Sequence, residues 1–205
     1  MEGCWLFVVK VVRAERLMVR TFEPSGQRPT FTTNNPLPMR LFLIGFMCSG
    51  KTTVGRELAK LMEMPFVDLD RVAEERVGPL LPFIQREGEA AFRKVEAEVL
   101  EELMNGPDAV IATGGGTPCE LDHMARMKSA GKVIWLDVPL EALMPRIERS
   151  GGDRPLLFGL KGEALMARVY ELLDQRTSTY AEADVIVQAN ATPTVVAQRI
   201  AAVVR

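Results

Sequence analysis

The 205-residue sequence is poor in cysteine and histidine and has no long apolar run. Its three cysteines, Cys4, Cys48 and Cys119, form no CxxC pair, which argues against a disulfide framework and suits the reducing cytoplasm, where we expect the protein. His123 is the only histidine, and without a partner pattern a surface or structural role is more typical of it than metal ligation or base catalysis. No run approaches the ~18 apolar residues of a membrane helix, so no membrane partner is expected.

The sequence also lacks an excess of charge of one sign. It has 25 Lys and Arg against 27 Asp and Glu, a formal net charge of −2. This balance gives no signal for nucleic acid or for an acidic membrane surface, so any basic site must be local. A length of 205 residues is enough for one domain with a sizeable core.

Residues 1–38 differ in composition from the rest of the chain. An apolar stretch, CWLFVVKVV, is interrupted by Lys10, and the turn-rich segment EPSGQRPTFTTNNPLP follows it. Arginines outnumber acids here, as in an organellar targeting peptide, but the glutamates count against that hypothesis. The other hypothesis is an unstructured extension that an over-early start codon adds. We expect a disordered extension over 1–38 and a folded domain over 39–205.

From residue 41 onward, short apolar runs alternate with amphipathic stretches. The predicted strands cover residues 41–45, 66–70, 109–116, 132–138 and 184–189. The predicted helices cover residues 52–62, 71–87, 89–104, 139–149, 163–177 and 193–205. This alternation predicts an α/β fold, a five-stranded parallel sheet flanked by helices. Such sheets bind ligands at the carboxyl ends of their strands, where the informative residues of this chain fall.

The segment GFMCSGKT at residues 45–52 matches the phosphate-binding pattern GxxxxGK[ST], and it follows a strand and opens a helix. In this motif, backbone N–H groups and the helix N-terminus bind phosphate oxygens, and Gly45 and Gly50 allow the tight turn. Lys51 offers its charge to the β- and γ-phosphates, and Thr52 offers a hydroxyl to Mg²⁺. The motif leaves kinase, ATPase, GTPase and nucleotide-binding regulator open. The lack of an NKxD guanine-reading segment and the small size favour a small-molecule kinase.

Two acids end the second predicted strand. Asp68 and Asp70 alternate there, so in a regular strand their side chains would point to opposite faces. At a strand end, one acid can hold Mg²⁺ through water while the other contacts an acceptor hydroxyl. Asp70 also precedes a helical stretch, so capping of that helix is an alternative that is compatible with catalysis.

Three arginines and a glycine run are candidates for an acceptor site. Arg93 lies beside an apolar helical stripe, Arg154 in a Gly-rich stretch typical of a mobile lid, and Arg176 near a helix end. A guanidinium can bind a carboxylate bidentately or stabilise a transferring phosphoryl group, whereas a solvated salt bridge is the alternative for any lone arginine. The glycines at 114–116 make sense where a ligand packs against bare backbone, with a flexible turn as the alternative.

Taken together, these segments resemble shikimate kinase over about residues 40–205. The matching segments, in the family's order, are GFMCSGKTTVG, FVDLD, EGEAAFRKVEAEVL, IATGGGTP, VIWLDVP, RPLL and QRTSTYAEAD. The resemblance implies a P-loop kinase of the nucleoside-monophosphate-kinase type, with a five-stranded parallel sheet and a lid. It also implies transfer of the γ-phosphoryl group of ATP to the 3-hydroxyl of shikimate, with Mg²⁺ as cofactor, in aromatic amino-acid biosynthesis.

The resemblance further implies roles for single residues. The ATP-binding set is Cys48, Ser49, Gly50, Lys51, Thr52, Thr53, Arg149, Arg154 and Thr192. The shikimate-binding set is Asp70, Arg93, Gly115, Gly116 and Arg176, of which the two arginines would grip the carboxylate. The metal-binding pair is Thr52 and Asp68, and the catalytic candidates are Lys51, Asp70 and Arg154. The expected partners are ATP and shikimate, and the expected state is a monomer.

The sequence departs from the family at a few places. Cys48 stands where the family usually has glycine, which puts a Cβ where a relaxed backbone is common. The lid between Arg149 and Arg154 is short, and the N-terminal extension has no counterpart in the family core. The competing hypotheses are a kinase for another small polyol acid, such as gluconate, and a regulator that has lost catalysis. The paired arginines and the glycine run favour shikimate, and the retained phosphate-binding and acidic residues favour an active enzyme.

A chain that begins at Met39 should be as stable and as active as the full chain, because linker composition precedes the strand that starts just after it. Thermal melting followed by circular dichroism, together with a turnover assay, tests this on both chains. A large drop in melting temperature on truncation would show instead that the preceding segment packs on the folded domain.

Overall fold

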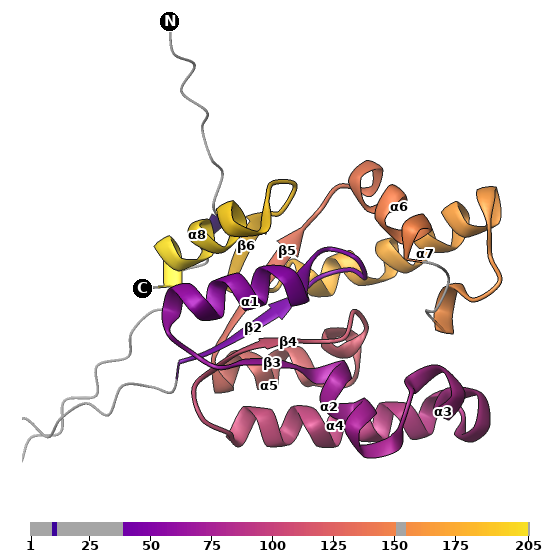
Figure 1. Cartoon of the computed structure of the whole chain (residues 1–205), viewed down its shortest axis with the longest axis horizontal. Helices are drawn as coiled ribbons and strands as arrows, with labels where there is room; N and C mark the ends of the chain where they lie inside the picture. The colour runs from indigo at the N-terminus through magenta and orange to yellow at the C-terminus, as the bar shows by residue number, and fades with distance from the viewer. Residues whose placement is uncertain (1–9, 12–38, 151–154, 205) are drawn as a thin grey trace, which may run out of the picture.

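The computed structural model describes residues 10–11, 39–150 and 155–204, and in these ranges a six-stranded sheet forms the centre of the molecule (Figure 1). The strand order is β1-β6-β5-β2-β4-β3. The bounds are β1 Lys10–Val11, β2 Arg40–Ile44, β3 Phe66–Asp68, β4 Ala109–Ala112, β5 Lys132–Asp137 and β6 Val185–Gln188. The pairs from β3 to β6 are all parallel, which confirms the predicted five-stranded parallel sheet, and β1 pairs antiparallel with β6.

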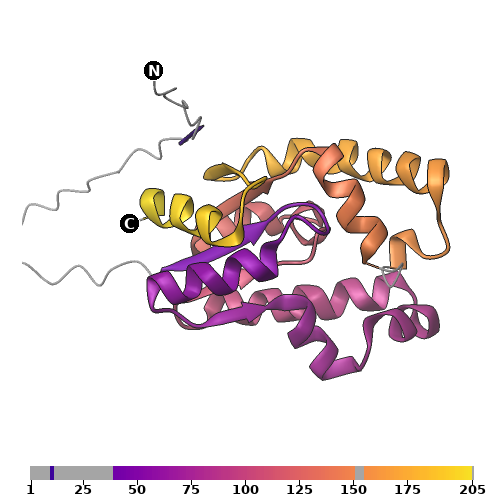
Figure 2. The same cartoon turned by 45° about the horizontal axis from the view of Figure 1, so that its top comes forward.

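Helices cover this sheet on both sides. Their bounds are α1 Lys51–Met62, α2 Leu69–Val77, α3 Leu80–Glu87, α4 Glu89–Asn105, α5 His123–Ala130, α6 Leu140–Arg149, α7 Gly162–Tyr180 and α8 Pro193–Val204. Two short 3₁₀ turns, η1 and η2, cover Thr117–Cys119 and Pro155–Leu157. α1 and α8 pack side by side on one face of the sheet, while α5 and α7 lie on the other side (Figure 1 and Figure 2).

The middle of the sheet is buried on both faces. Residues 41–44 of β2 and all of β4 are at most 4% exposed. A strand whose successive side chains are all buried needs a covering layer on each side, as is typical of parallel sheets. The continuous apolar runs of the sequence reflect this requirement.

β2 is the strand that positions the candidate site. It lies between β4 and β5, and the chain leaves it on one side through β3 and β4 and on the other through β5 and β6. At such a point, the loops at the carboxyl ends of neighbouring strands diverge and leave a crevice for ligands. The GFMCSGKT segment begins where β2 ends, so it borders this crevice.

The region after β3 differs from the sequence prediction. The helix predicted over 71–87 is two helices, α2 and α3, because Gly78 adopts a φ of 82° and Pro79 has no N–H to continue the α2 hydrogen bonds. The strand predicted over 66–70 also ends early, at Asp68. The chain therefore turns into α2 two residues sooner than the apolar pattern indicates.

A second difference concerns the segment after β4. The strand predicted over 109–116 ends at Ala112, so the glycine run lies in a loop. The apolar pattern did not predict α5, because this helix is only eight residues long and buries only His123, Met124 and Met127. So short an apolar stripe carries little helical signal. A surface or a structural role was expected for His123, and its burial agrees with the structural one.

The domain boundary placed at residue 38 stays a prediction. Of residues 1–38, the structure describes only Lys10–Val11, which pair with Val185 and Ile186 of β6, and the others lie outside the described residues. Within the described ranges, none of the helices has the length and apolar character needed to cross a membrane.

Candidate active site

The loop that joins β2 to α1 is held by its own lysine. Lys51 Nζ donates hydrogen bonds to the carbonyl oxygens of Gly45, at 2.8 Å, and Phe46, at 2.9 Å. Gly50, at the N-cap of α1, is left-handed with a φ of 97°, and no side chain caps the helix. The first amides of α1 therefore keep hydrogen-bonding capacity for an anion in the loop, the arrangement that binds phosphate oxygens.

Cys48 has a backbone conformation that favours glycine. Its φ is 60°, and the left-handed region costs a residue with a Cβ roughly 1–2 kcal/mol relative to glycine. The sequence had raised this concern, because glycine is usual at this position. The half-buried side chain packs against the hydrophobic core, so the thiol contributes contacts at the edge of the loop.

A cavity of about 680 Å³ opens over this loop and is the candidate nucleotide site. The residues of the loop and of the start of α1 that line it are Met47, Cys48, Ser49, Gly50, Lys51, Thr52, Thr53 and Val54. Asp68, at the end of β3, and Asp70, in the first turn of α2, also line it. The structure thus brings the P-loop and both acids to one cavity.

The remaining residues of the expected ATP-binding set are Arg149, Thr192 and Arg154. Arg149 is exposed, donates its Nε to a carbonyl of its own helix and does not line the cavity. Arg146, one turn earlier in α6, does line it and donates Nη1 to the carbonyl oxygen of Cys48 at 3.4 Å. Thr192 is exposed and lies between two residues that line the cavity. Arg154 lies outside the described residues.

Asp68 and Asp70 approach the cavity from a strand end and a helix start. Thr52 Oγ1 donates to Asp68 Oδ2 at 2.8 Å, so a hydroxyl and a carboxylate lie side by side. Asp70 lies in the first turn of α2, so it does not alternate with Asp68 along a strand. The alternative of Asp70 as helix cap is also wrong, because Asp68 holds the N-cap position and no side chain caps α2.

A second cavity of about 230 Å³ adjoins the first. The residues expected to bind the acceptor all line it: Asp70, Arg93, Gly115, Gly116 and Arg176. Met47, Asp70 and Gly115 line both cavities. A ligand in the second cavity can therefore meet the end of a ligand in the first beside Asp70.

The glycines at 114–116 let charged side chains approach the backbone closely. None of the three has a positive φ, so their surroundings rather than their conformation require glycine. The closest approaches would leave no room for a Cβ or only a tight fit. An ideal Cβ on Gly114 would lie 2.7 Å from Glu96 Oε1 and 2.9 Å from Asp70 Oδ1. The nearest side-chain atoms would be Arg176 Nη1 at 3.4 Å for Gly115 and Arg93 Nη1 at 3.1 Å for Gly116.

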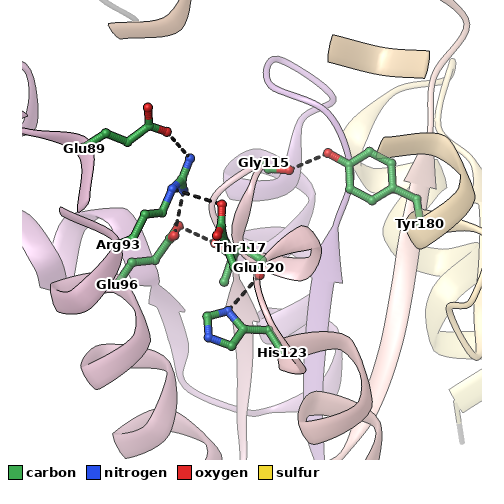
Figure 3. Close-up of polar contacts among 8 residues, drawn as sticks. All are labelled: Glu89, Arg93, Glu96, Gly115, Thr117, Glu120, His123 and Tyr180. Carbon is green, nitrogen blue, oxygen red and sulfur yellow. Dashed lines mark hydrogen bonds and ion pairs between the residues drawn. The ribbon is translucent and has the colours of Figure 1, made fainter. Parts of the chain in front are cut away.

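Arg93 is surrounded by three glutamates (Figure 3). Its Nη1 lies 2.8 Å from Glu96 and its Nη2 lies 3.0 Å from Glu89. Its Nε is 3.2 Å from Glu120, an ion pair without hydrogen-bond alignment. Burial lowers the pKa of Arg93, but the carboxylates, Glu96 foremost, more than offset this and raise the pKa above its usual value. The guanidinium is thus held charged and in one orientation.

Arg176 differs from Arg93 in its surroundings. It is only 8% exposed, and among the described residues no carboxylate lies within 4.0 Å of its guanidinium nitrogens. Its Cζ lies 5.7 Å from the centre of the Phe46 ring, a cation–π contact. A buried charge is costly without a counter-ion, so an anion that enters the cavity gains a strong partner here.

Tyr180, at the end of α7, anchors the glycine run. Its Oη donates to the carbonyl oxygen of Gly115 at 2.5 Å (Figure 3), and its ring packs on Trp135 at a centroid distance of 5.8 Å. Burial raises the pKa of the Tyr180 hydroxyl well above its ordinary value, against the opposing effect of Arg176. The hydroxyl therefore stays protonated and keeps donating.

Sequence reasoning missed Glu96, although a signal for it was present. Glu96 occupies the buried face of α4, with Phe92 and Val99, and is 1% exposed. A charged residue on an apolar stripe predicts a buried ionic partner, here Arg93. Tyr180 and Arg146 carried no comparable signal, because their partners lie far away in the sequence.

Comparisons with known proteins agree with this geometry. The sequence profile of the family described as "Shikimate kinase" matches residues 47–205. One curated relative is the shikimate kinase of Parabacteroides distasonis, which is 43% identical over 147 residues, 71% of this chain and 85% of the relative.

Solved structures give the same result. The shikimate kinase from Acinetobacter baumannii in complex with shikimate superposes with a TM-score of 0.73 at 36% identity, over 80% of this chain and 91% of that one. The shikimate kinase from Bacteroides thetaiotaomicron superposes with a TM-score of 0.72 at 35% identity, over 79% of this chain and 96% of that one.

Cys48 and Gly50 offer a matched pair of substitutions in the loop, since both have a positive φ. Cys48→Gly should preserve ATP affinity within about threefold, because it relaxes a strained backbone. Gly50→Ala should weaken ATP binding by about tenfold or more, because it introduces such strain at the helix start. Titration calorimetry measures both affinities, and equal losses in the two variants would contradict the backbone argument.

Proposed function

The chain belongs to the shikimate kinase family, and we propose from this membership that it transfers the γ-phosphoryl group of ATP to the 3-hydroxyl of shikimate. The products are shikimate 3-phosphate and ADP. The activity belongs to the shikimate pathway, which leads through chorismate to the aromatic amino acids. A relative that was solved with shikimate bound supports the choice of acceptor.

The observation that carries the proposal is the junction of the two cavities at Asp70. A kinase must bring an acceptor hydroxyl in line with the γ-phosphorus while both substrates are bound. Here the P-loop cavity and the arginine-lined cavity share Met47, Asp70 and Gly115. The phosphoryl group would cross between the cavities at these residues.

The nucleotide side uses the loop and its lysine. We place the phosphates of ATP against the loop amides and the N-terminus of α1. Lys51 would then direct its ammonium group from the carbonyls of Gly45 and Phe46 toward the β- and γ-phosphates. Arg146 supplies a further cation at this cavity, and the role of Arg154 at the transferring phosphoryl group rests on the family resemblance.

Mg²⁺ fits beside Thr52 and Asp68. The Thr52 hydroxyl and the Asp68 carboxylate, 2.8 Å apart at the nucleotide cavity, are the hard oxygen donors that this ion prefers. Mg²⁺ commonly takes only one or two protein ligands and completes its shell with phosphate oxygens and water. When bound, Mg²⁺ would neutralise charge on the β- and γ-phosphates.

Asp70 is placed to orient the acceptor and to receive its proton. Its carboxylate would accept a hydrogen bond from the shikimate 3-hydroxyl at the junction. As the hydroxyl oxygen bonds to the γ-phosphorus, the bond from that phosphorus to the bridging oxygen breaks and ADP leaves with the electron pair. The hydroxyl proton passes to Asp70. The rest of the catalysis is positioning and charge stabilisation.

The two arginines would both bind the shikimate carboxylate, but their surroundings differ before it binds. Arg176 brings a buried charge that has no acidic partner among the described residues. The Arg93 guanidinium is oriented by Glu96 and also forms ion pairs with two glutamates that are more exposed than Glu96. The glycines at 115 and 116 form the close-packed floor under the ring.

A coupled assay of ADP release with purified protein, ATP and Mg²⁺ tests the proposed function. We expect release that depends on shikimate and that gluconate does not replace. The same release with and without shikimate, or a preference for gluconate, would overturn the proposal.

Substitution of either arginine should reduce affinity for shikimate, and only one of the two substitutions should also reduce stability. Arg176→Ala and Arg93→Ala should each raise KM for shikimate on the order of 10- to 100-fold, with little change in KM for ATP. Arg93→Ala should also lower the free energy of unfolding by about 3–5 kcal/mol, because it leaves the buried Glu96 carboxylate without its cationic partner. Arg176→Ala should leave that free energy nearly unchanged.

Steady-state kinetics and urea unfolding measure both effects. Arg126→Ala is the control, because Arg126 forms a surface ion pair with Glu101 and lines neither cavity. Equal losses of affinity for ATP and shikimate in an arginine variant would indicate misfolding rather than a lost carboxylate contact.

A further inference from the structure

Three buried polar side chains stand in a row behind Arg93 (Figure 3). Glu96 is 1% exposed, Thr117 0% and His123 2%. They come from α4, from η1 and from the start of α5. Buried polar groups are costly unless each finds its hydrogen-bond partners, so the order of the contacts in this row is informative.

Thr117 and Arg93 use opposite oxygens of the Glu96 carboxylate. Thr117 Oγ1 donates to Oε1 at 2.5 Å, and Arg93 Nη1 lies 2.8 Å from Oε2. A carboxylate that is held through one oxygen cannot turn its plane freely. The Thr117 hydroxyl therefore decides where the other oxygen points, and through it the direction of the Arg93 guanidinium.

Thr117 is itself fixed from its other side. The His123 Nδ1 lies 2.9 Å from the Thr117 carbonyl oxygen, and because that oxygen can only accept, Nδ1 is the donor. The 3₁₀ turn that begins at Thr117 is closed by a hydrogen bond from the Cys119 amide to the Gly116 carbonyl, at 2.9 Å. The hydroxyl of Thr117 is thus presented by a rigid turn rather than by a mobile loop.

The other two glutamates at Arg93 are less suited to this task. The side chain of Glu89 is 56% exposed and that of Glu120 is 38% exposed. Exposed ion pairs are weak and exchange readily, so a ligand carboxylate can displace these two. Glu96 is enclosed and keeps its hold on Arg93 while a ligand is bound.

We propose that Thr117 is a positioning residue for the acceptor carboxylate, acting through Glu96 on Arg93; this rests on the function proposed above. Thr117 lines neither the nucleotide cavity nor the acceptor cavity, so it has no direct contact with either substrate. Its effect must pass through the Glu96 carboxylate. Thr117 is thus a determinant of acceptor affinity that lies behind the residues of the acceptor cavity.

Thr117→Val tests the proposal, because valine keeps the shape and removes the hydroxyl. We expect KM for shikimate to rise about five- to tenfold, as for one lost hydrogen bond, while kcat and KM for ATP change less than about twofold. Thr117→Ser restores the donor and should bring KM for shikimate back toward the wild-type value. If Thr117→Val does not fold, Thr117→Ala removes the same hydroxyl and takes its place in the comparison.

The methyl ester of shikimate separates positioning from a general structural defect. This acceptor has no charged carboxylate, so Thr117→Val should change its KM by less than about twofold. An equal rise for acid and ester, a rise in KM for ATP, or no rise for either acceptor would overturn the proposal, as would a Ser variant that behaves like Val. Failure of the proposed function is distinct, since wild-type protein would then show no shikimate-dependent ADP release.

Discussion

The acceptor site depends on a stretch of backbone without side chains at residues 114–116. Charged groups of Asp70 and Arg93 lie too close to Gly114 and Gly116 to leave ordinary room for a Cβ, and Arg176 lies at contact distance from the Cβ position of Gly115. These groups come from α2, α4 and α7, so the glycine run is the surface on which three separate helices converge. An ideal Cβ on Gly115 would also lie 3.4 Å from the Met47 amide, so the glycine turn packs against the P-loop. This contact fixes the position of the acceptor cavity relative to the nucleotide cavity.

The two arginines at this surface differ in the charges that surround them. Arg93 is oriented by a buried glutamate and shared with two exposed ones, so its direction is set before a ligand arrives. Arg176 is buried over the Phe46 ring and has no carboxylate partner in the described part of the chain. Arg93 is therefore the arginine with a fixed orientation, and Arg176 is the one whose charge no described carboxylate compensates. A carboxylate ligand satisfies both, which a neutral polyol would not.

Much of the fold and of the site was predictable because it rests on short-range patterns. Continuous apolar runs predicted the five parallel strands, and the GFMCSGKT spacing predicted the loop that lines the nucleotide cavity. The resemblance to the family assigned Asp70, Arg93 and Arg176 to one acceptor site, and the three side chains line a single cavity. The break between α2 and α3 at Gly78 was missed, although glycine followed by proline is itself a local signal.

By itself the sequence determined where the parallel strands lie, the phosphate-binding loop and the charged residues that are candidates for the site. Each of these depends on residues near one another in the chain. Tertiary structure alone decided which charges pair and which side chains stand behind them. Thr117 meets Glu96 across 21 residues, and Tyr180 meets Gly115 across 65. Arg146 rather than Arg149 faces the nucleotide cavity because of how α6 packs. Such contacts are set by the burial of whole helices, and no local periodicity encodes them.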